Sequence, residues 1–238
     1  MADEFSRMRM LIGSDKQKKL SESAVIVFGA GGVGSYVIEA LARGGIGKIG
    51  IVDNDTVSLT NINRQLIALH STVGQYKTEV CAKRIGDINP DCKVKLYTMF
   101  YSEENAAEID LSEYDYIVDA IDSVPSKLFL ASESVRLNIP LISSMGTGNK
   151  LFPDKLRITD ISKTHTCPLA KVMRYELRKR GINHLKVLFS EEKAVPHIGE
   201  CEDESGKGRH VGSVSFVPSC AGLMIAGEVI RDIAEITQ

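Results

Sequence analysis

A glycine-rich turn is the sequence feature that most restricts the fold of this chain. The turn, GAGGVG at residues 29–34, follows a short run of apolar and mostly β-branched residues at 24–28, and the residues after it repeat apolar side chains at helical spacing. This pattern predicts a strand, a tight turn and a helix. Gly29, Gly31 and Gly34 fit G-x-G-x-x-G, which lets backbone N–H groups approach a phosphate at the positive end of a helix. We therefore expect a nucleotide-binding domain.

Strand-like and helix-like segments continue to alternate through the first two thirds of the chain. The predicted strands are residues 24–28, 48–52, 94–100, 116–121 and 140–144, and the predicted helices are residues 33–43, 75–88, 103–109 and 125–138. Such alternation is typical of a Rossmann-like α/β fold, with a mainly parallel sheet covered by helices on both faces.

The pattern changes after residue 148. We predict an edge strand at 156–161, a basic amphipathic helix at 168–180 and another strand at 185–190, which together extend the sheet by antiparallel strands. Residues 191–212 are polar and rich in Gly, Glu and Lys, which indicates a mobile loop. From 214–217 the chain is expected to pass through Pro218 into a closing helix that ends near Ile236.

Three segments follow from this division: residues 1–23 as an N-terminal arm, 24–148 as the nucleotide-binding domain, and 149–238 as the sheet extension. The chain has 238 residues and 43% hydrophobic composition, which suits one main core.

The net charge of -2 argues against coating nucleic acid by charge alone. No apolar run approaches membrane-spanning length, so a cytoplasmic protein without a membrane partner is expected. The five cysteines form no C-x-x-C pair, so no structural zinc is expected.

Charged residues beside the turn indicate which nucleotide is bound. Asp53 ends the second predicted strand, where a carboxylate accepts hydrogen bonds from a ribose, and this suits NAD and ATP equally. Arg64 and Lys77 then place two cations near the phosphates, as a triphosphate requires but a dinucleotide does not. Asp122 follows the fourth strand, where a carboxylate can hold magnesium. ATP with Mg²⁺ is therefore the expected cofactor.

At these residues the sequence resembles the ThiF/MoeB/HesA family, bacterial relatives of the ubiquitin-activating enzymes, over roughly residues 5–148. The resemblance implies adenylation of a carboxylate by ATP, with Arg64, Lys77, Asp122 and Arg7 as catalytic residues. It implies that Arg7, in an N-terminal arm, reaches into the ATP site of a second subunit, and hence a homodimer. The ATP contacts that it implies are Gly29, Gly31, Gly32, Gly34, Asp53, Asn61, Arg64, Gln65 and Lys77, and the magnesium ligand is Asp122.

Within the family, the segments at residues 39–47, 60–65 and 120–123 are most similar to the branch that acts on tRNA. Members of that branch adenylate the threonyl carboxylate of N6-threonylcarbamoyladenosine beside the anticodon and cyclise it, releasing AMP and pyrophosphate. The resemblance thus implies a tRNA dehydratase. The basic helix is expected to contact the tRNA backbone through Lys171, Arg174, Arg178, Lys179 and Arg180.

Two other functions fit the same nucleotide site. An adenylating enzyme for a small sulfur-carrier protein, in thiamin or molybdopterin synthesis, would use it on a protein C-terminus, with Cys167 or Cys201 as a reactive thiol and a sulfur-transfer protein as partner. A regulatory nucleotide-binding module would bind ATP without releasing pyrophosphate. An essential cysteine would favour the first, and pyrophosphate exchange would exclude the second.

Overall fold

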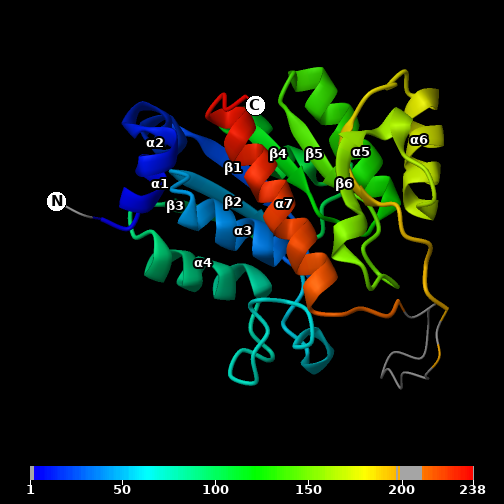
Figure 1. Ribbon diagram of the computed structural model, residues 1–238, viewed down its shortest axis with the longest axis horizontal. Coiled ribbons are helices and arrows are strands. Elements are labelled where there is room, and N and C mark those ends of the chain that lie inside the picture. The colour runs from blue at the N-terminus through cyan, green and yellow to red at the C-terminus, as the bar shows by residue number, and fades with distance from the viewer. Residues whose placement is uncertain (1–2, 197, 199–210, 238) are drawn as a thin grey trace.

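The computed structural model describes residues 3–196, 198 and 211–237 of the chain. Its centre is one seven-stranded sheet with the order β3-β2-β1-β4-β5-β7-β6 (Figure 1). The strands are β1 (Ala24–Phe28), β2 (Lys48–Val52), β3 (Lys93–Tyr97), β4 (Tyr116–Asp119), β5 (Leu141–Ser144), β6 (Leu156–Asp160) and β7 (Lys186–Ser190).

All neighbouring strands are parallel except the pair at the β6 edge. β1 lies between β2 and β4, and both pairings are parallel; all five residues of β1 pair with β2, and Val25–Phe28 pair with β4. β7 continues the parallel order next to β5, and β6 then returns antiparallel to β7. This confirms the predicted fold class, including the antiparallel extension near the C-terminus. Parallel strands direct their carboxyl ends to one edge, where the loops collect.

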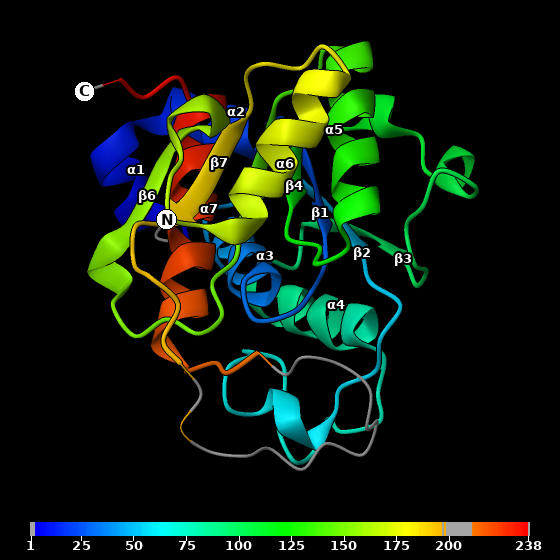
Figure 2. The same cartoon turned by 90° about the vertical axis from the view of Figure 1, so that its right-hand side faces the viewer.

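Helices cover both faces of the sheet, as Figure 2 shows. The helices are α1 (Ser6–Ile12), α2 (Ser14–Glu22), α3 (Gly34–Arg43), α4 (Lys77–Ile88), α5 (Val124–Leu137), α6 (Pro168–Lys179) and α7 (Phe216–Ile233). One apolar core contains residues of α3, α4 and α7, and a second contains residues of α5 and α6. The five inner strands β2, β1, β4, β5 and β7 are buried at all or nearly all positions because helices cover both of their faces.

Two predictions about helices are wrong. Residues 103–109 contain only a short 3-10 turn at Ala106–Glu108. Asn105 explains this, because its side chain accepts a hydrogen bond from the Ser102 N–H and donates one to the Phe100 carbonyl, which satisfies the backbone without a helix.

The closing helix also begins earlier than predicted, at Phe216 rather than after Pro218. Pro218 lies in the opening turn, where its missing N–H removes no helical hydrogen bond.

The predicted N-terminal arm contains the two helices α1 and α2. Most of the predicted mobile loop lies outside the described residues. None of the helices in the described ranges is long and apolar enough to cross a membrane.

Candidate nucleotide and acyl site

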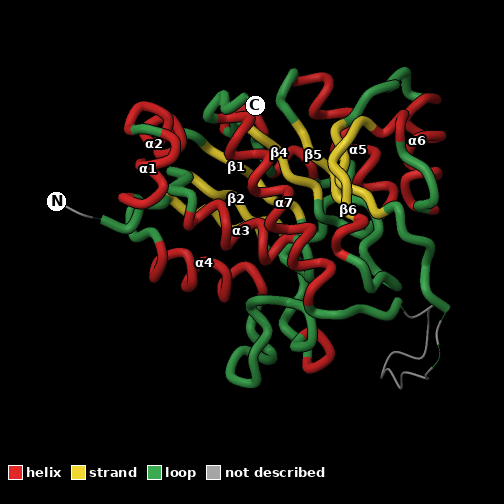
Figure 3. Tube along the Cα trace, in the orientation of Figure 1, coloured by secondary structure: helices red, strands yellow, loops and turns green. Residues whose placement is uncertain are grey.

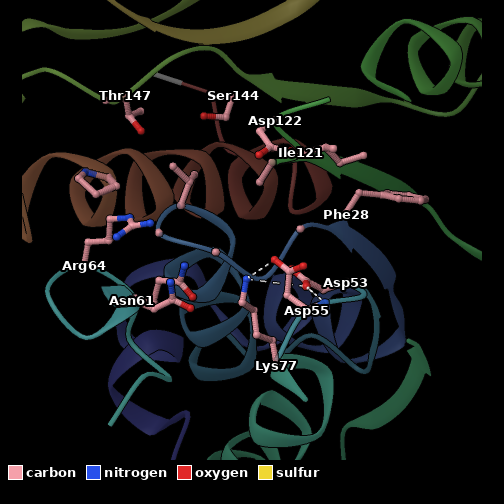
Figure 4. A pocket seen from close by; sticks show the side chains of 18 of the residues that line it. Phe28, Asp53, Asp55, Asn61, Arg64, Lys77, Ile121, Asp122, Ser144 and Thr147 are labelled. Carbon is pink, nitrogen blue, oxygen red and sulfur yellow. Dashed lines mark hydrogen bonds and ion pairs between the residues drawn. The ribbon is translucent and has the colours of Figure 1, made fainter. Parts of the chain in front are cut away.

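A cavity of about 670 Å³ opens at the carboxyl ends of the central strands. The long loop at residues 53–76 lies below the sheet in Figure 3, beside the segment that leads into α7. The glycine-rich turn, that loop and the loops after β4 and β5 all line the cavity. Figure 4 shows Asp53, Asn61, Arg64 and Lys77 on one wall and Asp122, Ser144 and Thr147 on the other.

The four glycines of the turn have different structural roles. Gly29 has a positive φ of 90°, and a Cβ there would lie 2.6 Å from the Ala120 carbonyl oxygen. A Cβ at Gly34 would lie 1.7 Å from the Gly29 carbonyl oxygen, so these two residues allow the turn to close. At Gly31 the nearest atom would be the Gln65 Nε2 at 3.8 Å, and at Gly32 the Pro218 Cβ at 3.3 Å. Gly31 therefore leaves space on the cavity side for a phosphate.

Asp53 fixes the turn as well as lining the cavity. Its carboxylate accepts hydrogen bonds from the Ala30 N–H at 2.7 Å and from the Asp55 N–H at 2.8 Å. Burial raises the pKa of Asp53 above its ordinary value, more than the Lys77 ammonium and these two N–H groups lower it. Its place after β2, adjacent to the turn, is the one expected of a ribose acceptor.

Lys77 is held in an ion pair that was not predicted. Its Nζ is 2.7 Å from a carboxylate oxygen of Asp55 and 3.9 Å from one of Asp53, and its side chain is only 6% exposed. The Lys77 N–H also donates to the Asp55 carbonyl at 3.0 Å. Asp55 thus keeps the ammonium group at the cavity wall, within reach of an anion there.

The segment at residues 61–65 supplies the remaining predicted contacts. The Arg64 guanidinium donates to the Thr60 carbonyl at 2.9 Å and to the Asn63 side chain at 3.0 Å, so it lies along its own loop. Asn61 accepts a hydrogen bond from the Ser58 N–H. The Gln65 Oε1 is buried without a hydrogen-bond partner among the described residues, and Gln65 lines the cavity. An unpaired buried acceptor indicates a donor that arrives with a ligand.

The outer wall of the cavity is built by residues 211–213, which we call the strap. Asn149 exchanges two hydrogen bonds with Gly212, each of 2.7 Å: its backbone N–H donates to the Gly212 carbonyl, and its Oδ1 accepts from the Gly212 N–H. The Asn63 amide donates to the Ser213 carbonyl at 3.0 Å. Val211 and Ser213 are therefore placed at the cavity by two asparagines from opposite sides.

Comparison with known proteins places the chain in a family. The model of the ThiF family matches residues 5–238. The chain belongs to the ThiF family. It is 46% identical to the tRNA threonylcarbamoyladenosine dehydratase of Bacillus subtilis over 98% of this chain and 95% of that protein.

Solved structures agree with the ThiF family assignment. The crystal structure of Escherichia coli tRNA N6-threonylcarbamoyladenosine dehydratase in complex with ATP matches with a TM-score of 0.87 and 33% identity, covering 98% of this chain and 94% of that one. A sulfur carrier protein adenylyltransferase of Thermus thermophilus is 36% identical, but over only 59% of this chain and 52% of that protein.

The basic helix of this ThiF family member is only partly free to contact a partner. Arg174 is turned inward and donates to the Thr164 carbonyl at 2.9 Å. Lys179 and Arg180 are paired with Glu176. Lys171 and Arg178 are exposed. Leu169 of the same helix lines the cavity, whereas none of the five predicted cations does.

Arg7 and Cys167 are not among the residues that line the cavity, although the Cys167 Sγ lies directly behind the cavity-lining Gly146, 3.9 Å from a Cβ placed there. Arg7 is exposed on α1, outside the cavity, which is compatible with action in a second subunit. Cys167 is only 4% exposed and caps α6, while Cys201 lies outside the described residues.

Sequence reasoning missed three features of the site. These are the Asp55 partner of Lys77, the strap, and a buried pair of Asp119 and Lys127 below the β4–α5 loop. Only Asp119 carried a signal, as an acidic residue at the end of a strand.

Proposed function

We propose that this chain is an ATP-dependent tRNA threonylcarbamoyladenosine dehydratase. The observation that carries the proposal is the 46% identity to the Bacillus subtilis dehydratase over almost the whole of both chains. The Escherichia coli structure supports it, since a dehydratase with the same fold holds ATP. The similarity to the Thermus thermophilus sulfur-carrier enzyme covers only 59% of this chain, and the Cys167 side chain is buried, so the dehydratase is the better supported function.

The glycine turn and the start of α3 hold the phosphates of ATP in this proposal, and Asp53 accepts hydrogen bonds from the ribose. Arg64 and Lys77 neutralise the β- and γ-phosphates. Asn61 and Gln65, which carry no charge, contribute amide groups to the same wall of the cavity. A carboxylate oxygen of the substrate bonds to the α-phosphorus while the bond to pyrophosphate breaks. The two cations stabilise the charge that develops on the leaving group. An atom of the substrate's own carbamoyl group then attacks the activated carbonyl carbon, and AMP leaves.

Asp122 fits a magnesium ion. It is exposed, it lines the cavity opposite the glycine turn, and no hydrogen bond or ion pair with the other described residues occupies its carboxylate. The described residues contain no cluster of three His, Cys, Asp or Glu that would form a complete metal cage. Magnesium is usually bound by one or two carboxylates together with substrate phosphates, which matches this arrangement. When bound, the ion supplies further neutralisation of phosphate charge.

The tRNA and a second subunit complete the proposed site. The exposed cations Lys171 and Arg178 lie on α6, the helix whose Leu169 lines the cavity, and we propose that they contact the phosphates of an RNA whose modified nucleoside enters the cavity. On α1, Met10 and Leu11 are 84% and 88% exposed beside Arg7. An apolar face of this kind favours burial against a second copy, which would bring Arg7 into the partner's cavity.

The purified protein, incubated with ATP, Mg²⁺ and tRNA that carries N6-threonylcarbamoyladenosine, tests the dehydratase directly. We expect AMP and pyrophosphate, and a nucleoside lighter by one water molecule in mass spectrometry. The Cys167→Ala variant should retain this activity. An absence of both AMP and mass loss would refute the dehydratase, and a dead Cys167→Ala variant that still folds would favour the sulfur-carrier function.

A further inference from the structure

A buried ion pair lies directly behind the loop that carries Asp122. The Lys127 side chain, in the opening turn of α5, is 0% exposed, and that of Asp119, the last residue of β4, is 1% exposed. The Lys127 Nζ is 3.0 Å from each carboxylate oxygen of Asp119. The Ser143 hydroxyl on β5 donates to the same carboxylate at 2.6 Å. One carboxylate therefore joins β4, β5 and α5.

The stability of the core does not account for this pair. Taking two charges out of water is costly, and an apolar pair of similar volume is often as stable or more stable. Lys127 also lies near the positive end of the α5 dipole, where a cation is disfavoured. The energetic cost points to a role in fixing the local backbone.

The backbone that the pair fixes is that of Ile121. The Lys127 ammonium donates to the Ile121 carbonyl at 3.0 Å, and the Ile121 N–H donates to the Asp119 carboxylate at 3.2 Å. Both polar groups of this residue are thus bound to the pair. Asp122 is next in the chain, and its own side chain makes no hydrogen bond to the other described residues. The position of its carboxylate therefore depends on the backbone before it.

The same loop is attached to the glycine turn. The Ala120 N–H donates to the Phe28 carbonyl at 2.8 Å, and the Ala120 carbonyl limits the space at Gly29. We propose that Lys127 is a positioning residue which, with Asp119, sets the place of the Asp122 carboxylate relative to the phosphates bound at the turn. This inference rests on the proposed function, in which Asp122 holds the magnesium ion of Mg·ATP.

Calorimetric titration of ATP, with and without MgCl₂, tests the inference without turnover. Lys127→Met alone leaves a buried carboxylate without its cation and is expected to be unstable. The double variant Asp119→Asn/Lys127→Met removes both charges with side chains of similar volume, and the carbonyl of the introduced asparagine can still accept the Ser143 and Ile121 hydrogen bonds. We expect it to fold and to bind ATP without magnesium like the parent. The gain in ATP affinity that magnesium provides should fall about tenfold, as in an Asp122→Asn variant.

Lys186→Met is the matched control, because Lys186 is paired with Asp232 and Glu228 at the opposite end of the sheet. It should keep the full effect of magnesium. The inference is overturned if the double variant keeps that effect, if it does not fold, or if magnesium does not change ATP binding to the parent. Failure of the dehydratase itself is read separately, from the tRNA assay, so the two failures are distinguishable.

Discussion

Individual residues at the cavity separate into those that shape it and those that face a ligand. Gly29 and Gly34 are required because another backbone carbonyl occupies the space of a side chain. Gly31 borders open space, and Gln65 presents an unpaired buried oxygen. The sequence motif treats the glycines alike, since it records only their spacing, whereas the contacts of each one depend on the chain around it.

Alanine substitutions distinguish these glycines. Gly34→Ala would place a methyl group 1.7 Å from the Gly29 carbonyl oxygen, so we expect the melting temperature to fall by about 10 °C or more. Gly31→Ala should melt like the parent but bind ATP about tenfold more weakly, because the methyl group occupies the phosphate side. Differential scanning calorimetry and ATP titration measure the two effects. Equal loss of stability in both variants would contradict this division.

Arg64 belongs to the ligand-facing group. Among the described residues, its guanidinium hydrogen-bonds to its own loop alone, at Thr60 and Asn63, so Arg64→Ala should leave the melting temperature unchanged. Removing this cation should lower the turnover number about a hundredfold, because charge on the departing pyrophosphate is then less stabilised. AMP release under saturating ATP measures it. Arg136→Ala, which loses a surface pair with Glu133 on α5, is the control and should be fully active.

At the scale of elements, the sequence predicted what is buried and regular. Five of the seven strands are buried at all or nearly all positions, and their apolar character alone located them. From the sequence, the loops that form the cavity could be assigned only to positions between the predicted strands and helices, and their shape could not be predicted. Their shape depends on distant partners, such as the bond from Asn63 to Ser213 across 150 residues. Local patterns contain no information about such pairs, so neither the strap nor the buried partner of Asp119 was predicted.

Glu39 of α3 joins the two helices α3 and α4, because its largely buried carboxylate is paired with Arg84 of α4. Burial acts to raise the pKa of Glu39, but hydrogen bonds from Arg84 and Arg43 outweigh it and hold the pKa below the ordinary value of 4.5. A lowered pKa contributes stability above the unfolded value that is lost as pH falls through the folded value.

Glu39→Gln should therefore be less stable at neutral pH and lose less free energy of unfolding below pH 4.5. Urea unfolding at a series of pH values measures both slopes. Glu22→Gln, in an exposed pair with Lys18, should follow the parent curve. A Glu39→Gln curve parallel to that of the parent would show that Glu39 does not titrate with folding.

At the scale of the whole molecule, the proposed catalytic residues do not all belong to one cavity. Arg64, Lys77 and Asp122 line it, whereas Arg7 lies on α1, outside it. The proposed site is therefore complete only in a dimer, and each subunit would both receive and supply an arginine.

Mixing two inactive variants tests this arrangement. Arg7→Ala and Lys77→Ala subunits, each alone, should lose about a hundredfold of activity. After exchange of subunits, half of the dimers are mixed and each has one intact site, so about a quarter of the parent activity should return. Activity is measured after the two proteins are unfolded and refolded together. A mixture as inactive as its components would exclude action of Arg7 between subunits.

The construction of the strap has a consequence for how such an enzyme can change in evolution. Much of the nucleotide side of the cavity consists of strand ends and helix starts, where residues such as Gly29, Gly34 and Asp53 also hold the fold together. Val211 and Ser213 are attached instead by a few amide hydrogen bonds from Asn63 and Asn149, with no strand or helix of their own. Substitutions in the strap can therefore accumulate while the residues that carry out adenylation stay the same. In this way one adenylating fold can diversify toward different acyl substrates.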